Sequence, residues 1–243
     1  MLLLAVDTSG KNGSLALATV AEGQSEQKGQ SEREVSIYEI VPLAGGAFSA
    51  ELVPRIATLL QRCGYNKNQI DAFAVASGPG SFTGLRVGLA AIKALAEALQ
   101  KRIAAVSVLE AIASCGASPG PVVAALDAGR GDVYVGEYEF DHGAHMRMRS
   151  ERLLSRDEFL SEAKAAPGIN KVIITPNASL AETLRAAGEA IHSAVELIEY
   201  PTSAVIARLG WQHLQRGETV RPEDLEANYI RRSDAEIFSK PTP

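Results

Sequence analysis

The sequence has few of the residues that mark a disulfide-bonded or membrane-spanning protein. Its only two cysteines, Cys63 and Cys115, lie in separate segments with no CxxC spacing, so neither a disulfide framework nor a zinc knuckle is indicated, which fits a reducing compartment. No run reaches the roughly 18 uncharged apolar residues that a membrane helix requires. The opening Met1–Val6 is too short for a signal peptide and no basic stretch precedes it. We therefore expect a cytoplasmic protein with no contact to the membrane.

Positive charge is scarce as well. The chain has 24 Lys and Arg against 29 Asp and Glu, a formal net charge of −5, and its basic residues are scattered except for Arg231 and Arg232. A protein that grips a phosphate backbone by itself needs a basic patch, so we expect any contact with RNA to be indirect. The arginine pair is predicted to be a solvated tail. With 243 residues, 46% of them hydrophobic, the chain can bury one large core or two smaller ones.

Hydrophobic periodicity predicts strands that alternate with helices, which is α/β organisation. The predicted strands cover residues 2–6, 14–20, 35–41, 72–76, 122–126, 133–140 and 172–174. The predicted helices cover residues 47–63, 82–99, 107–115 and 203–215, and Ser/Glu capping boxes predict helix starts at Ser107, Ser155 and Ser179. The polar segment 22–34 is predicted to be a loop, and the residues after Pro222 an irregular tail.

One pattern occurs twice, around Asp7 and around Asp127. It consists of a strand that ends in aspartate, a glycine-rich turn and a second strand. One echo of this kind is compatible with chance or with duplication. Duplicated hairpins of this form are typical of actin-like and sugar-kinase-like proteins, where they hold nucleotide phosphates. The nucleotide-binding candidates are Asp7, Thr8, Ser9, Asp127 and Gly129. The alternative is that each aspartate only bonds the N–H groups of its own turn.

A glycine-rich run, Ser77–Gly84, lies between a predicted strand and a predicted helix. Its spacing matches neither GxGxxG nor a Walker A loop, which argues against a phosphate loop. Gly78, Pro79, Gly80 and Ser81 are therefore predicted to form a structural turn, with Ser81 or Thr83 capping the helix that follows.

That helix has small residues on one face, at Gly84, Gly88 and Ala91. A mid-helix glycine costs about 1 kcal/mol relative to alanine, so another element is expected to approach closely. The sequence does not decide between the protein's own sheet and another subunit.

Several ordered motifs together resemble the TsaB family, formerly called YeaZ. The most specific is the run Gly-Pro-Gly-Ser-Phe-Thr-Gly-Leu-Arg at residues 78–86, supported by Val6–Ser9, Ser107–Ala111 and residues 125–134. The resemblance implies an α/β, actin-like (ASKHA, ribonuclease H-like) duplicated fold of two subdomains with mixed sheets flanked by helices. The implied subdomains cover residues 1–105, with a helix at 202–217 packing back, and residues 106–201, followed by a tail at 218–243.

The same resemblance implies a part in making N6-threonylcarbamoyladenosine in tRNA. The implied partners are the catalytic relative TsaD and the ATPase TsaE, with a homodimer when the chain is alone. TsaD carries a metal through two histidines four residues apart on a helix, and here the aligned positions are Phe48 and Leu52, which cannot ligate a cation. His142 and His145 are predicted to lie in a surface loop, so no metal site and no catalytic residue is expected.

The resemblance therefore favours a non-catalytic subunit that binds TsaD through the predicted helices at 47–63 and 82–99. The residues proposed for that interface are Phe48, Leu52, Ile56, Gly84, Arg86, Gly88 and Ala91. No cofactor is firmly implied, and ATP or ADP with Mg²⁺ at the complex interface stays open. The alternatives are a stand-alone actin-like ATPase or small-molecule kinase and, with less support, a glycoprotease-type peptidase, for which neither HExxH nor GxSxG is present.

Overall fold

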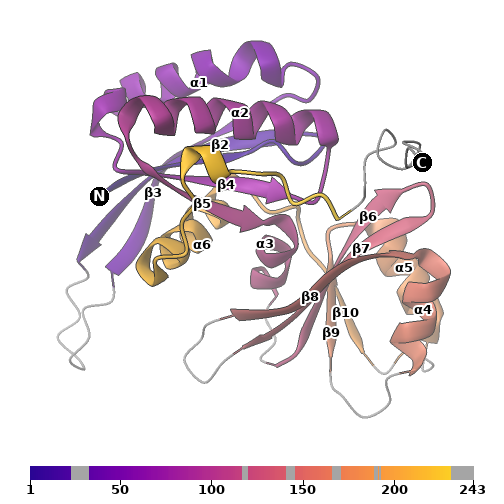
Figure 1. Ribbon diagram of the computed structural model, residues 1–243. Helices are drawn as coiled ribbons and strands as arrows, with labels where there is room; N and C mark the ends of the chain where they lie inside the picture. The colour runs from indigo at the N-terminus through magenta and orange to yellow at the C-terminus, as the bar shows by residue number, and fades with distance from the viewer. Residues whose placement is uncertain are drawn as a thin grey trace, which may run out of the picture. The chain divides into compact units, whose positions relative to one another are not determined.

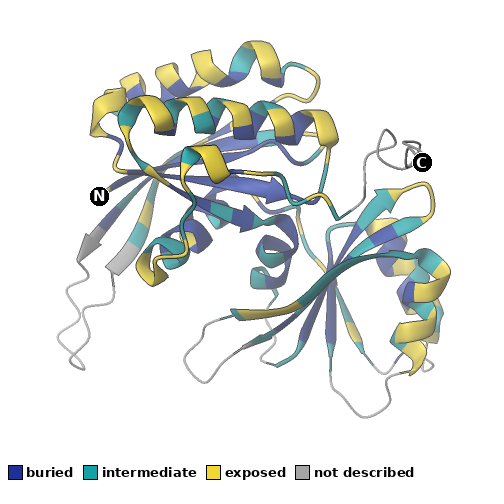
Figure 2. Ribbon diagram, viewed as in Figure 1, coloured by how far each residue is buried: buried dark blue, intermediate teal, exposed yellow. Residues whose placement is uncertain are grey.

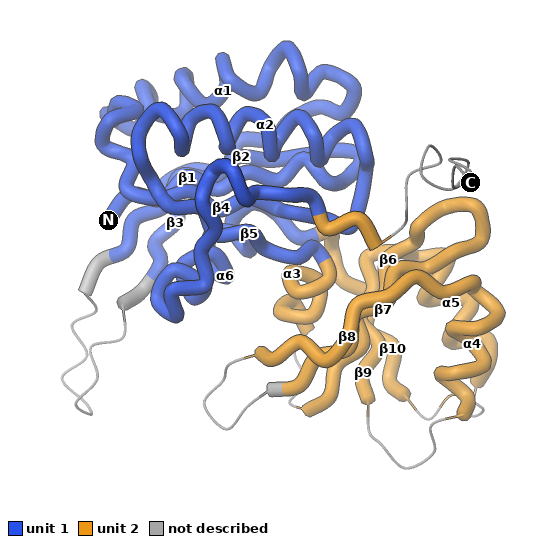
Figure 3. The backbone as a smooth tube through the Cα atoms, in the orientation of Figure 1, with its two compact units in different colours: residues 1–108, 201–227 blue, residues 109–200, 228–243 orange. Residues whose placement is uncertain are grey.

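The computed structural model describes residues 1–22, 33–116, 120–140, 146–165, 171–188, 191 and 193–230 (Figure 1). The predictions made for most of the 22–34 loop, for His142 and His145 and for Arg231 and Arg232 fall outside these residues. The chain divides into two compact units (Figure 3). Unit 1 comprises residues 1–108 and 201–227, and unit 2 comprises residues 109–200 and 228–243.

Unit 1 is built on a five-stranded mixed sheet with the order β3-β2-β1-β4-β5. Its strands are β1 (Leu2–Asp7), β2 (Gly13–Glu22), β3 (Arg33–Leu43), β4 (Ala72–Gly78) and β5 (Arg102–Ser107). The first three strands form an antiparallel meander, and β4 and β5 run parallel to β1.

Helices α1 (Phe48–Arg62) and α2 (Phe82–Leu99) cover one face of this sheet, and α6 (Ser203–Arg216) covers the other (Figure 1). Alternation along the strands separates the two cores. The face under α1 and α2 carries large side chains such as Leu4 and Phe73, which are fully buried. On the α6 face small residues meet, since a Cβ at Gly210 would lie 2.4 Å from the Cβ of Ala74. The helix can therefore approach the strands closely.

Unit 2 repeats the same sheet. Its strands are β6 (Val122–Gly129), β7 (Asp132–Phe140), β8 (Met146–Ser155), β9 (Val172–Thr175) and β10 (Ala194–Leu197), and its helices are α3 (Val108–Ser114), whose first residue falls in unit 1, α4 (Arg156–Ala165) and α5 (Ala178–Ala186). The order β8-β7-β6-β9-β10 matches the order of unit 1, with an antiparallel meander and two parallel strands beside it. The pattern that occurs around Asp7 and around Asp127 is thus part of a duplicated sheet. The predicted actin-like α/β fold class is confirmed.

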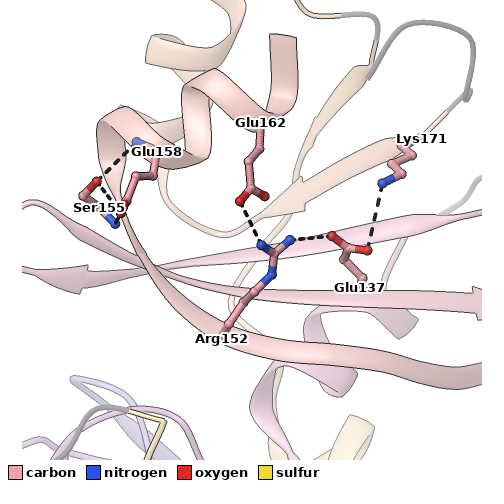
Figure 4. Close-up of polar contacts among 6 residues, drawn as sticks. All are labelled: Glu137, Arg152, Ser155, Glu158, Glu162 and Lys171. Carbon is pink, nitrogen blue, oxygen red and sulfur yellow. Dashed lines mark hydrogen bonds and ion pairs between the residues drawn. The ribbon is translucent and has the colours of Figure 1, made fainter. Parts of the chain in front are cut away.

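Polar contacts join β7, β8 and α4 in unit 2 (Figure 4). The guanidinium of Arg152 donates to Glu162 at 2.8 Å and to Glu137 at 2.7 Å, and Lys171 lies 4.0 Å from the other oxygen of Glu137. The predicted capping box at the start of α4 is confirmed: the Ser155 hydroxyl accepts from the N–H of Glu158 at 3.2 Å, while the Glu158 carboxylate accepts from the N–H of Ser155 at 2.8 Å.

The box predicted at Ser179 is wrong. Helix α5 begins one residue earlier, at Ala178, and the N-cap is Asn177. Its side chain accepts from the backbone N–H of Asp127 instead of capping the helix. A tertiary contact therefore uses the side chain that could have capped α5.

The sequence prediction also missed β5, β8 and β10. The β5 run is alanine-rich, β8 begins with alternating methionine and arginine, and β10 has four half-exposed or exposed residues, so none gives a clear β pattern. The predicted tail also contains structure: Leu225 is 5% exposed in the core of unit 1, and Val220 bridges to Ile103. No helix among the described residues is both long and apolar enough to cross a membrane.

Candidate functional site

The first aspartate turn begins where β1 ends in unit 1. Asp7 is 2% exposed, and its Oδ1 accepts hydrogen bonds from the backbone N–H of Ser9 at 2.8 Å and from the Ser9 hydroxyl at 2.5 Å. This is an Asx turn, in which a side-chain carboxylate bonds a donor two residues ahead. The carboxylate therefore holds the turn together.

Burial raises the pKa of Asp7 above its ordinary value, because the charged form loses its hydration. The two bonds from Ser9 favour the charged form and oppose this effect, but burial is the larger cause. Both of these bonds and the burial keep the Asp7 carboxylate within the turn.

Thr8 lies in the same turn and contacts the small face of α2. Its hydroxyl donates to the carbonyl oxygen of Gly84 at 2.8 Å. A Cβ on Gly84 would lie 2.0 Å from the Thr8 carbonyl oxygen, and a Cβ on Gly88 would lie 2.3 Å from Thr8 Oγ1. Close approach of the protein's own β1–β2 turn therefore accounts for both glycines.

The glycine-rich turn before α2 packs on the same segment. The Ser81 N–H donates to the Ser9 carbonyl oxygen at 2.6 Å, and the Ser81 hydroxyl caps α2 by accepting from the N–H of Gly84 at 3.2 Å. A Cβ on Gly80 would lie 2.4 Å from the Ser9 carbonyl oxygen. The turn thus comprises Gly78, Pro79, Gly80 and Ser81, and it holds the start of α2 against the aspartate turn. Sequence reasoning recognised the turn but missed Thr8 and Ser9 as its partners.

The second aspartate turn, in unit 2, has the same local design. Oδ1 of Asp127 accepts from the N–H of Gly129 at 2.7 Å, again two residues ahead. Three left-handed residues follow in succession, with φ values of 71° at Gly129, 58° at Arg130 and 85° at Gly131. The guanidinium of Arg156 lies 3.6 Å from Asp127, whose side chain is 32% exposed. Sequence reasoning did not find Arg156, because only the fold places the start of α4 beside this turn.

The nucleotide-binding candidates therefore differ in what they can offer. Asp7, Thr8 and Ser9 are all buried and bonded within unit 1, whereas Asp127 keeps an accessible carboxylate. Among the residues that the structure describes, no three His, Cys, Asp or Glu side chains gather where they could hold a metal ion. The nucleotide hypothesis stays a prediction, and Asp127 is the candidate whose geometry suits it better.

The proposed interface residues fall into two groups. Phe48, Leu52 and Ile56 of α1 are 8%, 1% and 4% exposed and belong to the core of unit 1, and Gly84 and Gly88 are buried. Arg86 is exposed and Ala91 is half-buried. The interface role of all seven residues stays a prediction, but the five buried ones can act only by shaping the helices that a partner would contact.

Helices α1 and α2 carry exposed residues along the side away from the sheet (Figure 2). Val53 of α1 is 56% exposed and Phe82 of α2 is 40% exposed. The guanidinium carbon of Arg86 lies 3.7 Å from the centre of the Phe82 ring, a cation–π contact on the protein surface. Sequence reasoning missed Val53 and Phe82, since periodicity identified the buried stripe and not the opposite face.

The duplicated sheets and paired aspartate turns define an actin-like protein of two units. The family model described as TsaD, tRNA N6-adenosine threonylcarbamoyltransferase, matches residues 39–238. The solved structure of YeaZ from Pseudomonas aeruginosa superposes with a TM-score of 0.66 at 26% identity, covering 94% of this chain and 99% of that one. The chain belongs to the TsaD-related family and, within it, to the TsaB (YeaZ) group.

Two curated relatives carry the name tRNA threonylcarbamoyladenosine biosynthesis protein TsaB. The one from Bacillus subtilis is 34% identical over 144 residues, which cover 59% of this chain and 57% of that protein. The one from Haemophilus influenzae is 31% identical over 172 residues, which cover 69% of this chain and 65% of that protein. The matched region thus spans less than two thirds of either relative.

Proposed function

We propose that this chain is a cytoplasmic, non-catalytic subunit of the complex that makes N6-threonylcarbamoyladenosine in bacterial tRNA. In this proposal it binds TsaD, organises that enzyme and admits the ATPase TsaE, and it contacts tRNA only indirectly. The names of the relatives support the pathway, and the family model supports descent from the same fold as the transferase.

One observation carries the non-catalytic part of the proposal. The resemblance to the family places Phe48 and Leu52 at the positions of the metal-binding histidines of TsaD, and both side chains pack in the core beneath α1. A Cβ on Gly13 would lie 3.1 Å from the ring of Phe48, so this ring fills the space beside the β1–β2 hairpin. A buried apolar contact therefore takes the place of a metal ligand at this position.

The exposed face of α1 and α2 supports a protein partner. Val53 on α1 and Phe82 on α2 are exposed, Arg86 lies over the Phe82 ring, and aromatic residues and arginine are enriched at protein interfaces. The homodimer expected for the isolated chain would use the same face, because a second copy of the chain can cover the exposed apolar surface.

The decisive experiment mixes the purified chain with its cognate TsaD and TsaE. We expect a stable complex with TsaD by size-exclusion chromatography, and tRNA threonylcarbamoylation that depends on adding the chain. Failure to associate with TsaD, or full modification without the chain, would contradict the proposal. The Leu197→Glu variant, altered at a 45% exposed residue of unit 2, is the matched control and should associate normally.

A stand-alone ATPase or small-molecule kinase is the competing function. Asp127, accessible and at the second hairpin, is the observation that favours it. ATP turnover by the isolated chain that Asp127→Asn abolishes would support this alternative. Under our proposal the isolated chain gives no turnover above buffer, and peptide cleavage is absent as well.

A further inference from the structure

A segment that follows α6 crosses the open edge of the unit 1 sheet. Gly217 ends α6 in a left-handed conformation, with a φ of 73°, and the chain then turns toward β5, the outer strand of the sheet. Val220 pairs with Ile103 of β5 in an antiparallel bridge, and its N–H donates to the Ile103 carbonyl oxygen at 2.9 Å. We call residues 219–227 the strap, since they cover part of a sheet edge that β4 leaves unpaired.

The strap then reaches α2, on the other face of the sheet from α6. Its residues Pro222–Asp224 form a single 3₁₀ turn, and the Nζ of Lys93 in α2 donates to the Glu223 carbonyl oxygen at 3.1 Å. Leu225 is 5% exposed and belongs to the same core cluster as Ala96 of α2. Figure 1 shows the strap in yellow beside α2 and β5. It therefore connects the sheet edge to the core beneath α2.

The strap is held at few points. Leu225 is the one buried residue among its nine, while Val220 and Ala227 pack on the core and stay partly exposed. Among the described residues, its other anchors are the bridge at Val220 and the bond from Lys93 to Glu223. Segments with few buried contacts and exposed backbone open at a lower free energy than the core of their unit. We therefore expect the strap to open while unit 1 stays folded.

The two halves of α2 are fixed by different parts of the chain. The first half is held by the turn after β1, through the contacts of Thr8 with Gly84 and Gly88. The second half, residues 90–99, contains five alanines, whose short side chains bury little apolar area. Leu225 supplies apolar area at this half, and Lys93 joins it to the strap. Opening of the strap would thus loosen the second half of α2 and leave the first half in place.

We propose that the strap is a latch that opens independently of the rest of unit 1 and, when closed, holds residues 90–99 of α2 in the form that a protein partner binds. The inference rests on the proposed function, in which TsaD binds α1 and α2. A partner that binds only the closed state stabilises closure by the same factor by which closure favours binding. The latch is therefore a means of regulating the partner surface from the far side of the sheet edge.

The Leu225→Asp variant should hold the latch open, because a charge is not tolerated in the core that the leucine fills. We expect this variant to remain folded. In NMR hydrogen exchange of the full chain, the amides of Val220 and of residues 90–99 should exchange at least about tenfold faster than in the wild type, whereas those of β1 stay protected. Glu226→Gln, at the exposed neighbouring residue, is the matched control and should exchange like the wild type.

The latch is contradicted if Leu225→Asp unfolds unit 1, since the strap would then be inseparable from the core. It is also contradicted if residues 90–99 keep their protection, since the strap would then not hold α2. Leu225→Ala is the milder variant, in which the amides of Val220 and of residues 90–99 should lose protection by a common factor of at least about ten. Clearly unequal factors would mean that the strap and α2 do not open together.

Binding to TsaD tests the role of the latch. Leu225→Asp should bind TsaD at least about tenfold more weakly than the wild type, because only the closed fraction is competent, and Glu226→Gln should bind as the wild type does. Equal affinity of Leu225→Asp and the wild type would overturn the proposal. If the wild type itself does not bind TsaD, the proposed function fails, and the exchange measurement still decides whether the strap opens and loosens α2.

Discussion

The Thr8 hydroxyl occupies the space that a side chain at position 88 would need. A Cβ on Gly88 would lie 2.3 Å from Thr8 Oγ1, which itself donates to the carbonyl oxygen of Gly84 at 2.8 Å. The turn after β1 and the second turn of α2 therefore fit together only if residue 88 has no side chain. Because the same turn contains Asp7, this contact ties the glycine-rich helix to the first aspartate turn.

We predict that Gly88→Ala destabilises the chain. An alanine would gain about 1 kcal/mol of helix propensity, but crowding against Thr8 costs about 1–3 kcal/mol and should outweigh it. Urea denaturation measures the difference. In a Thr8→Ala background the atom that would collide is gone, so the same substitution should be neutral or stabilising. Equal destabilisation in both backgrounds would show that Thr8 is not the cause.

Asp7→Asn should stabilise the chain at neutral pH. Burial raises the pKa of Asp7 in the folded state, so folding is least disfavoured when this carboxyl is protonated. The stability that this proton confers is fully present below the unfolded-state pKa, which is near 3.8, and is lost as pH rises through the folded-state pKa. The asparagine keeps an oxygen acceptor for Ser9 and carries no charge.

The check is the difference in Tm between the variant and the wild type from pH 4 to pH 8. We expect the variant to gain at pH 7 and the gain to shrink toward pH 4. A gain that is independent of pH would mean that the charge of Asp7 is not responsible.

Val53→Glu should weaken association with TsaD at least about tenfold. The side chain is 56% exposed, so a charge there meets water in the free chain but would be desolvated in an interface through α1. Analytical ultracentrifugation gives the affinity, and an unchanged Tm shows that the fold is intact. If Val53→Glu binds as well as Leu197→Glu, the partner does not use this face.

Arg152→Gln should lower the stability of unit 2 by roughly 1 kcal/mol, and the loss should decrease in high salt. Arg152 bonds two carboxylates from different elements but is partly exposed, and solvent screens such pairs. Arg149→Gln is the matched control, because Arg149 makes one exposed pair with Glu139 and its loss should not be measurable. Thermal unfolding monitored by circular dichroism measures both variants at low and high salt.

The elements with strong periodicity could be placed from the sequence alone. Helix α2 begins and ends where predicted, at Phe82 and Leu99, since an amphipathic stripe and a serine cap act locally. The repeated pattern around Asp7 and Asp127 was visible in the sequence, but it took the matching strand orders of the two sheets to show that it is a duplication. The family motif around Gly78–Arg86 could be recognised because it is one continuous segment.

Tertiary structure alone decided what these elements contact. It placed Thr8 against Gly88 and Asn177 against Asp127, pairs that are separated along the chain. It also showed that the element close to Gly84 and Gly88 is the protein's own turn after β1. The spacing of the glycines did not decide between this turn and another subunit. Periodicity reports which face of an element is buried, but the identity of the neighbour depends on how the strands are ordered in the sheet, and that order follows from the packing of the whole unit.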